Sequence, residues 1–550
     1  MHTLNPDPEP LSLGVPVRHA LSLSGCFGEI RHNHFHAGVD IRSSHSGKPD
    51  EIISAANGFV SRIEIHSDSY GKIIYVQHPG GYTTVYAHIL SFRPDIEAKV
   101  REYQYQTQEY EVTLDFNPRE FPVFKGDHIA YMGNTGASRG THLHFELRKT
   151  LTNEVLDPLE FGLVVKDNIS PQLKKVKLYG FAQEGGLVFE KIVPKKLLGQ
   201  VQPVRGDFLG VGIEGQDRNN QSWHTTGLKN ITLFVDGKQI YEYHQKGWSM
   251  EDSRYMNAHI DYKNKIQSLG QIHRCYKLPG NCLPLYHTDE SNGLFQLPDT
   301  SVHKVVIRIS DVSGNTSSDT FRIRKINEES LKAPFCPGKM VFYDQDFQWS
   351  CPSGSVFFEK GTLYESTPLV FDTLSARTPR MRSPWMGVSG YGIPLHKKIK
   401  IGLLPEMPIQ EHLREKYFIA VKSGNISLST LDSQWQGDTL WSTHNQLGYF
   451  SIQLDTIPPA ISSVNFRYDM SKQKYMKFRI SDNVPSVRVS KELKYHAYID
   501  GKWVLMEHDA KSRTIRHEFT PELEKGKHEL RILLTDGRNN QKEYHAVFVR

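Results

Sequence analysis

Three short segments of the chain occur twice, in the same order. The pairs are Asp167–Pro171 with Asp455–Pro459, Phe234–Lys238 with Tyr498–Lys502, and His303–Asp311 with His528–Asp536. The last pair alternates apolar and polar residues, as half-buried strands do, and the middle pair contains Asp-Gly, a dipeptide typical of two-residue hairpins. Such a repeat predicts two copies of one structural unit. We expect two immunoglobulin-like β-sandwiches, over residues 166–327 and 455–550.

The first copy is longer than the second between its Asp-Gly turn and its last strand. Asp236 and Asp311 are 75 positions apart, whereas Asp500 and Asp536 are 36 apart. We therefore place an insertion near residues 248–294. In both copies, acidic residues follow predicted strands beside Asn or Gly, where turn-forming side-chain chemistry is favoured over calcium ligation. These residues are Asp217, Asp311, Asp482 and Asp536.

The other two regions also predict β-structure. Residues 1–165 contain short alternating segments separated by Asn-Gly, Tyr-Gly and Gly-Gly, a pattern typical of antiparallel strands. Residues 328–454 are rich in Gly, Pro, Ser and aromatics, with recognisable strands at 417–421 and 449–454, and we assign them no fold beyond β-rich. A length of 550 residues favours three or four domains, and 38 % hydrophobic residues are ordinary for folded protein. The expected class is mostly β, with an antiparallel β domain first.

Charge and hydropathy bear on the partners of the chain. The net charge is +5, and Lys and Arg are interleaved with Asp and Glu, so a nucleic-acid partner is not indicated. No apolar run is long enough for a transmembrane segment or a signal peptide, and residues 1–10 are polar and rich in proline.

Five cysteines leave room for two short disulfide-closed loops. Cys275 and Cys282 flank a Pro-Gly-Asn turn, and Cys336 and Cys351 are also close in sequence. In this pairing Cys26 would have no cysteine partner. The alternative is that all five are small buried residues. No CxxC pair occurs, so a structural zinc finger is not expected.

A group of histidines in the first quarter predicts a metal site. His142 and His144 are separated by one residue in an apolar run, so their side chains point to the same face of a strand. His36 and Asp40 lie where a glycine and β-branched residues favour a loop running into a strand. A His, His, Asp set suits Zn²⁺, and three protein ligands leave a fourth position open, as in catalytic zinc sites. Surplus histidines such as His88 are available for proton chemistry.

Four motifs in this region together resemble a known family. They are His36-x-x-x-Asp40, Tyr86-Ala87-His88, Gly133-Asn134-Thr135-Gly136-x-Ser138-x-Gly140 and His142-x-His144. In this order they are similar to the lysostaphin-type (LytM-like) zinc endopeptidases, which cut peptide bonds in bacterial peptidoglycan. The resemblance covers residues 21–162 and implies an antiparallel β peptidase domain. It says nothing about the rest of the chain.

The resemblance implies a role for each of five residues. His36, Asp40 and His144 would bind one zinc ion, and His88 and His142 would handle the attacking water and the developing oxyanion. The implied substrate is peptidoglycan peptides, with cell-envelope proteins as further partners of the β-sandwich domains. Because peptidoglycan lies outside the cytosol, the implied location is the periplasm, the outer cell envelope or the exterior, and the signal peptide is expected to be missing from this sequence.

Two other functions stay open at this point. One is a non-catalytic relative that binds the cell wall or activates an amidase. The other is a surface scaffold or adhesion protein whose peptidase domain is vestigial or blocked.

Several neighbouring residues compete with the five for a role at the site. His34 is the main rival of His36, and His32 is expected to be solvated. Glu146 is either a support for the metal ligands or an exposed strand residue. Ordinary surface positions are expected for three further histidines: His45, His66 and His78.

Residues 90–124 form an insertion within the expected peptidase domain. Simple members of the family cross from the Tyr-Ala-His strand to the Lys-Gly-Asp turn by a short connection, whereas 36 residues separate His88 from Lys125 here. Pro94–Glu102 shows helix-start chemistry, and Val112–Phe116 alternates like a strand. Long insertions beside active sites tend to be functional. We expect a wall of the substrate groove, with a loosely packed loop as the alternative.

Overall fold

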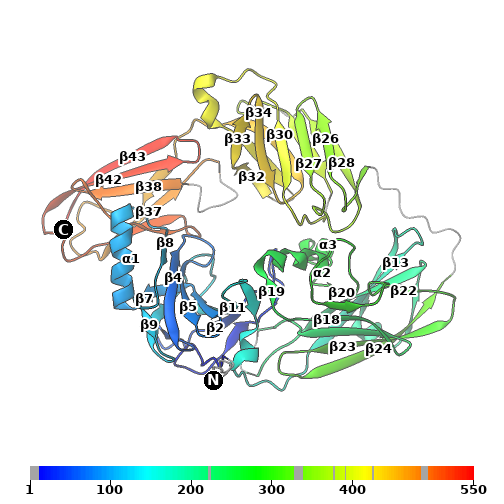
Figure 1. Ribbon diagram of the computed structural model, residues 1–550. Coiled ribbons are helices and arrows are strands. Elements are labelled where there is room, and N and C mark those ends of the chain that lie inside the picture. The colour runs from blue at the N-terminus through cyan, green and yellow to red at the C-terminus, as the bar shows by residue number, and fades with distance from the viewer. Residues whose placement is uncertain are drawn as a thin grey trace, which may run out of the picture.

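Strands dominate the computed structural model, which describes residues 11–550 except 221–223, 327–337, 376–377, 391, 424–425 and 485–492. Most strands pair antiparallel, which confirms the mostly-β prediction. Figure 1 shows four groups of sheets around a ring, so that the last strands return to the first group. We call these groups the N-terminal region (11–165), the first repeat (166–326), the middle region (338–454) and the second repeat (455–550). The predicted domain limits stay a proposal.

The N-terminal region is built on a ten-stranded sheet in which β2 and β11 are neighbours, and a second sheet joins β3, β10 and β7. Both sheets contribute to one apolar core. On β11, Leu143, Phe145 and Leu147 are fully buried in this core, so the alternate residues point to the opposite face. The strands are β1 (Leu23–Gly25), β2 (Val39–Arg42), β3 (Glu51–Ile53), β4 (Gly58–Ile65), β5 (Lys72–His78), β6 (Tyr82–Ala87), β7 (Ile89–Phe92), β8 (Val112–Asp115), β9 (Pro122–Val123), β10 (His128–Met132), β11 (His142–Lys149) and β12 (Glu154–Leu156).

The segment 90–124 is integrated into this region. Helix α1 (Pro94–Thr107) buries Ile96 in the core, and an ion pair forms on its surface, with Arg101 Nε 3.4 Å from Glu97 Oε1. Strands β8 and β9 both pair with β4 and extend the large sheet. The segment therefore contributes to the core, and its predicted role in a substrate groove stays a prediction.

The first repeat consists of a five-stranded and a six-stranded sheet. The predicted Asp-Gly hairpin joins β17 to β18, with positive φ at Asp236 (+48°) and Gly237 (+87°), as a type I′ turn requires. Its elements are β13 (Gln172–Phe181), β14 (Leu187–Pro194), β15 (Val201–Val204), β16 (Phe208–Gln216), β17 (Asn230–Val235), β18 (Lys238–His244), β19 (Trp248–Ser249), α2 (Met256–His259), α3 (Tyr262–Ile266), β20 (His273–Arg274), β21 (Tyr286–Thr288), β22 (Phe295–Gln296), β23 (Val302–Ser310) and β24 (Thr316–Lys325).

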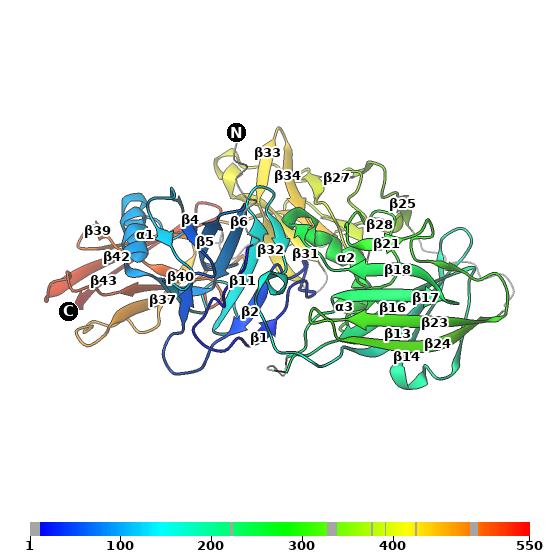
Figure 2. The ribbon, with the colours of Figure 1, turned by 60° about the horizontal axis from the view of Figure 1, so that its bottom comes forward.

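The insertion of the first repeat reaches the N-terminal region, and Figure 2 shows the two lying side by side. Strand β19 pairs with β12, placing Trp248 opposite Val155. The Trp248 ring is 1 % exposed and lies 4.3 Å from the ring of Phe27 and 5.4 Å from that of Phe35, measured between centroids. These residues belong to the same apolar cluster as the core of the first repeat. The two regions therefore share part of one core.

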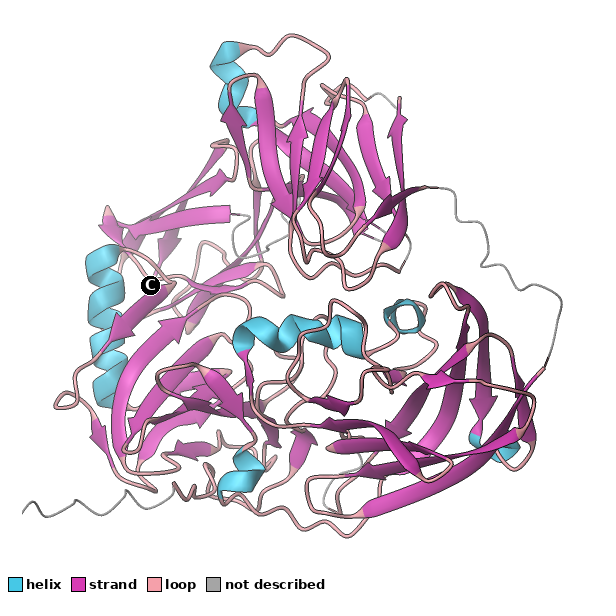
Figure 3. Ribbon diagram, turned by 45° about the vertical axis from the view of Figure 1, so that its right-hand side comes forward, coloured by secondary structure: helices cyan, strands magenta, loops and turns pink. Residues whose placement is uncertain are grey.

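The middle region consists of a six-stranded and a five-stranded sheet around one core, and Figure 3 shows how few helices accompany them. The strands expected at 417–421 and 449–454 are present. Its strands are β25 (Lys339–Val341), β26 (Phe347–Cys351), β27 (Gly354–Phe358), β28 (Thr367–Leu374), β29 (Trp385–Ser389), β30 (Ile399–Leu403), β31 (Tyr417–Ser423), β32 (Ile426–Leu431), β33 (Ser433–Gln436), β34 (Thr439–His444) and β35 (Gly448–Leu454).

The second repeat has two four-stranded sheets and reproduces the hairpin of the first. Asp500 (φ +50°) accepts a hydrogen bond from His528 Nδ1 at 2.6 Å, just as Asp236 accepts one from His303 Nδ1 at 2.7 Å. The repeated His and Asp-Gly motifs thus form the same contact twice. The strands are β36 (Ala460–Ser463), β37 (Tyr475–Ser481), β38 (Leu493–Ile499), β39 (Lys502–Trp503), β40 (Glu507–Asp509), β41 (Thr514–Glu518), β42 (Lys527–Asp536) and β43 (Gln541–Val549).

The second repeat packs against the N-terminal region. Lys72 Nζ lies 3.0 Å from Glu507 Oε1 although the Lys72 side chain is almost fully buried. The ring of Tyr105 on α1 meets that of Trp503 edge-on, with centroids 5.1 Å apart. The ring in Figure 1 is therefore closed by side-chain contacts.

Two expectations from the sequence are wrong. No disulfide joins Cys275 to Cys282, and Cys282 is exposed, so neither the first disulfide-closed loop nor the alternative of five buried cysteines is correct; Cys336 lies outside the described residues. His78 is 3 % exposed rather than on the surface, and its Nδ1 lies 2.8 Å from the carbonyl of Asn57. Among the described helices, none is long and apolar enough to cross a membrane.

Candidate metal centre

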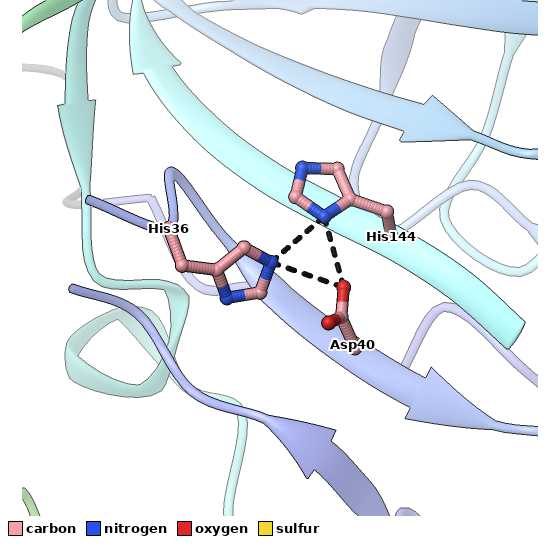
Figure 4. A group of neighbouring side chains, drawn as sticks. All are labelled: His36, Asp40 and His144. Carbon is pink, nitrogen blue, oxygen red and sulfur yellow. Dashed lines mark hydrogen bonds and ion pairs between the residues drawn. The ribbon is translucent and has the colours of Figure 1, made fainter. Parts of the chain in front are cut away.

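Three of the predicted site residues bring their ligand atoms to one point. His36 Nε2, Asp40 Oδ1 and His144 Nδ1 form a triangle whose three sides are each 3.0 Å (Figure 4). The three residues are 5 %, 8 % and 4 % exposed. Within the described chain, this is the one cluster of potential metal ligands that contains histidine.

Strand pairing explains why residues far apart in sequence meet here. Strands β2 and β11 are antiparallel, and their register sets Asp40 directly opposite His144. His36 precedes β2 on a loop that must pass close to β11. A Cβ atom on Gly38 would lie 2.2 Å from the carbonyl oxygen of Phe145, so only glycine fits at this point of the loop.

The outer nitrogens of the two histidines are held by hydrogen bonds. His36 Nδ1 lies 2.7 Å from the carbonyl of Cys26, which can only accept, so His36 donates there and keeps Nε2 free for a ligand. His144 Nε2 lies 2.8 Å from Glu146 Oε1. Such outer hydrogen bonds fix the tautomer and ring orientation of metal-binding histidines.

Glu146 supports His144 and is not an exposed strand residue. It is fully buried and accepts hydrogen bonds from the Tyr70 hydroxyl at 2.6 Å and from Arg148 Nε at 2.6 Å. Burial raises the pKa of Glu146, but the positive charge of Arg148 and the hydrogen bond from His144 outweigh this and lower it to about 2. Glu146 is therefore a carboxylate and a firm acceptor for His144.

Asp40 has a similar anchor on its second oxygen. Arg31 donates from its guanidinium to Asp40 Oδ2 at 2.7 Å, which leaves Oδ1 in the triangle. Burial raises the pKa of Asp40, but the neighbouring His36 and the hydrogen bond from His144 lower it well below its ordinary value. Asp40 is ionised, as a metal ligand must be.

His88 and His142 lie beside the triangle and are held in a common way. His88 Nδ1 lies 2.9 Å from the carbonyl of Thr135, and His142 Nδ1 lies 2.8 Å from the carbonyl of Gly140. Both rings donate through Nδ1, so each keeps Nε2 available. Their centroids are 4.8 Å apart, and His142 Nε2 is 3.6 Å from Asp40 Oδ1.

The backbone at His88 is in a conformation that non-glycine residues seldom adopt, with φ at +62°. Burial, together with the charges of His144 and His142, lowers the pKa of His88 to about 3. His88 is therefore a neutral imidazole at neutral pH. Strained backbone of this kind is concentrated at functional sites, where the surrounding structure imposes it.

The donor set and its spacing fit a zinc ion. Tetrahedral ligands at about 2.0–2.2 Å from zinc lie about 3.3–3.6 Å from one another, so a small outward shift of the 3.0 Å triangle would admit the ion. Burial lowers the pKa of His144, but hydrogen bonds with Asp40 and Glu146 raise it to about 9. The two carboxylates beside His144 therefore stabilise a positive charge at that residue.

The structure brings together the five residues predicted for the site. The division between three metal ligands and two proton-handling histidines stays a prediction. His34 and His32, the rivals of His36, are exposed and lie outside the triangle. Sequence reasoning missed Tyr70 and Arg31, because no local pattern links a tyrosine in a turn or an arginine in a loop to a carboxylate elsewhere.

Comparisons with known proteins find similar sequences for part of the chain. The model of Peptidase family M23 matches residues 34–105. The chain is 31 % identical over 128 residues to an uncharacterized metalloprotease of Haemophilus influenzae, covering 23 % of this chain and 21 % of that protein. It is 25 % identical over 149 residues to the DD-carboxypeptidase/endopeptidase Mpg of Neisseria meningitidis serogroup B, covering 27 % and 26 %. The catalytic domain of lysostaphin from Staphylococcus simulans shows 18 % identity and a TM-score of 0.19, covering 26 % of this chain and 91 % of that domain.

The N-terminal region therefore contains a peptidase M23 domain, and the resemblance to the lysostaphin-type family is confirmed. The matched residues include His36, Asp40 and His88 and end before the pair on β11, which the fold brings to the same site. The chain spans about a quarter or less of the length of these curated relatives. The match supports peptidase activity for this region.

Proposed function

We propose that this chain is a zinc-dependent metalloendopeptidase that hydrolyses peptide bonds in bacterial cell-wall peptidoglycan. The observation that carries the proposal is the buried triangle of His36, Asp40 and His144, with two further histidines beside it. The substrate class rests on the family resemblance. Periplasm, outer cell envelope or exterior is the corresponding location, and the two repeats and the middle region offer surfaces for envelope partners.

The proposed chemistry divides the five residues into two groups. His36, Asp40 and His144 hold the ion, which when bound supplies Lewis acidity toward water and toward the peptide carbonyl. His88 and His142 present Nε2 to the same space, because their Nδ1 atoms are committed to carbonyls. They orient the attacking water and take up its proton.

The bond changes follow from this placement. The water oxygen attacks the peptide carbonyl carbon, and the carbonyl oxygen becomes an oxyanion. This oxyanion accepts a hydrogen bond from whichever of His88 and His142 has taken up the proton of the water. The C–N bond then breaks, and the proton taken from water passes to the departing amine. The His142 side chain is 19 % exposed whereas His88 is buried, so His142 is the better placed of the pair to contact the substrate.

The test is to measure zinc content and digestion of purified peptidoglycan on the same preparations. Replacing His36, Asp40 or His144 by Ala should lose both zinc and activity, because each removes a ligand. Asp40→Asn should also weaken binding, since it removes the negative charge. Replacing His88 or His142 by Ala should lower the rate by about 10²–10⁴-fold while zinc stays near one per chain.

His34→Ala is the matched control, because His34 is an exposed histidine two positions from His36. It should keep both zinc and activity. If His142→Ala lost zinc and His144→Ala kept it, the roles within the β11 pair would be reversed. Wild-type protein that binds zinc without cleaving peptidoglycan would favour the non-catalytic alternative, and activity that survives complete zinc removal would exclude the proposed mechanism.

A further inference from the structure

Each repeat contains a cluster of three aspartates. Asp167, Asp217 and Asp311 form the first cluster, and Asp455, Asp482 and Asp536 form the second. Within each cluster, one carboxylate oxygen from each residue lies within 4.8 Å of the other two. Three like charges at this distance repel one another unless a cation or protons offset them.

The two clusters occupy the same place in their repeats. The first aspartate of each lies in the connection that enters the repeat, the second directly follows a strand (β16 or β37), and the third stands at the end of β23 or β42. An asparagine completes each cluster in the same way. Asn315 Nδ2 donates to Asp311 Oδ2 at 2.9 Å, and Asn540 Nδ2 donates to Asp536 Oδ2 at 2.9 Å.

Within the described part of the chain, local turn contacts leave one carboxylate oxygen of the second aspartate unpaired in each cluster. Asp217 is 5 % exposed, and its Oδ2 accepts a hydrogen bond from Thr226 at 3.1 Å, but its Oδ1 is buried with no hydrogen-bond partner in the described structure. Asp482 is only half-buried and its carboxylate accepts hydrogen bonds from the amides of Asn483 and Val484, but its Oδ1 also has no partner among the described residues. A buried carboxylate oxygen left unpaired is costly unless something absent from the protein's own side chains binds it.

A small cavity adjoins the first cluster. It has a volume of about 30 Å³ and is lined by Asp167, Asp217 and Asp311 together. This is enough for a single ion or one or two waters. Lys229 lines the same cavity but pairs with Asp157 at 3.3 Å, and none of the six aspartates forms an ion pair with a lysine or arginine among the described residues.

We propose that each cluster binds one calcium ion. The donors are oxygens alone, which suits a hard cation and not the nitrogen and sulfur preferences of zinc. Calcium takes six to eight oxygen ligands in flexible geometry, so three carboxylates leave positions for backbone carbonyls and water. The sequence alone favoured turn chemistry at these positions. The fold adds two observations to the sequence. It brings the connection that enters each repeat together with two strand ends, and it leaves one oxygen of Asp217 unpaired among the described residues.

The proposed first site would stabilise the junction between the N-terminal region and the first repeat. Cys26 and Phe27 line the same cavity from the N-terminal side. The carbonyl of Cys26 accepts a hydrogen bond from His36 Nδ1, so the cavity wall is hydrogen-bonded to a residue of the candidate metal centre. An ion at the Asp167 cluster would thus restrain both the junction and the loop behind His36.

Calorimetric titration of the zinc-loaded full chain with Ca²⁺ tests the proposal. We expect two ions per chain, with dissociation constants of about 10⁻³ M or tighter, the range of extracellular calcium modules. Asp217→Asn and Asp482→Asn should each reduce the stoichiometry to one, and the double variant should bind none. Asp438→Asn, at an exposed hairpin position, is the matched control and should bind two.

Asn has the shape of Asp, and circular dichroism of each variant would establish that it is folded. Wild-type protein that takes up no Ca²⁺ at about 10 mM, well above the expected dissociation constant, would overturn the proposal. So would a folded double variant that still binds two ions. Equal or tighter binding of Mg²⁺ in the same titration would overturn the choice of calcium.

Discussion

Trp248 is expected to stabilise the loop that carries His36, although it lies more than two hundred positions further along the chain. Its ring packs on Phe27 and Phe35, and Phe35 immediately precedes the proposed ligand. Ser253, in the same insertion, receives a hydrogen bond from the Phe35 amide at 3.0 Å. Trp248→Ala should therefore weaken the metal centre without touching a ligand.

The expected size of the effect follows from burial. Removing a fully buried Trp side chain costs about 3–5 kcal/mol. If all of this free energy were lost from zinc binding through displacement of the His36 loop, the zinc dissociation constant would rise. At 1.4 kcal/mol per factor of ten, the rise would be between about 10²-fold and about 4 × 10³-fold. This is an upper limit, because part of the loss destabilises the first repeat instead.

The assay combines zinc affinity, from competition with a chelator, with the midpoint of denaturant unfolding. Trp248→Phe should behave nearly as wild type, since it keeps the aromatic packing. Trp435→Ala is a second control: Trp435 packs on the core of the middle region, so its loss should shift unfolding and leave zinc affinity unchanged. Folded Trp248→Ala with wild-type zinc affinity would refute the reasoning.

Two further predictions concern stability away from the metal centre. Ile96 is fully buried in α1, so Ile96→Ala should lower the free energy of unfolding by about 2–5 kcal/mol and leave the zinc content unchanged. A loss below about 0.5 kcal/mol, as at a surface position, would mean that the segment 90–124 is only loosely packed. His528→Gln should destabilise the second repeat more at about pH 6 than at about pH 9. Burial lowers the pKa of His528, but the bond to Asp500 raises it above its ordinary 6.5 overall, so the stabilisation is complete below 6.5 and is lost as pH rises through the raised value. Denaturation at both pH values measures this, and an equal difference at the two would contradict it.

The sequence was sufficient for those parts of the molecule that depend on local pattern. The spacing of His142 and His144 predicted a shared strand face, and the two Asp-Gly dipeptides predicted hairpins that both adopt positive φ. What it did not predict depends on contacts between distant segments. Glu146 supports His144 because Tyr70 and Arg148, from other positions in the fold, hold its carboxylate. His78 is buried because Asn57, in the turn before β4, and Thr84, on β6, both contact its ring.

The two ends of the candidate metal centre are held by different parts of the chain. On one side, the insertion of the first repeat packs on the loop before His36. On the other, Lys511 of the second repeat donates to the carbonyls of Asn134 and Ser138, in the glycine-rich turn whose Thr135 carbonyl holds His88. The loop before His36 and the turn that holds His88 are therefore each contacted by a segment outside the matched residues 34–105. If the proposed roles hold, breaking either set of contacts should shift the three proposed metal ligands relative to the proposed acid–base pair, His88 and His142.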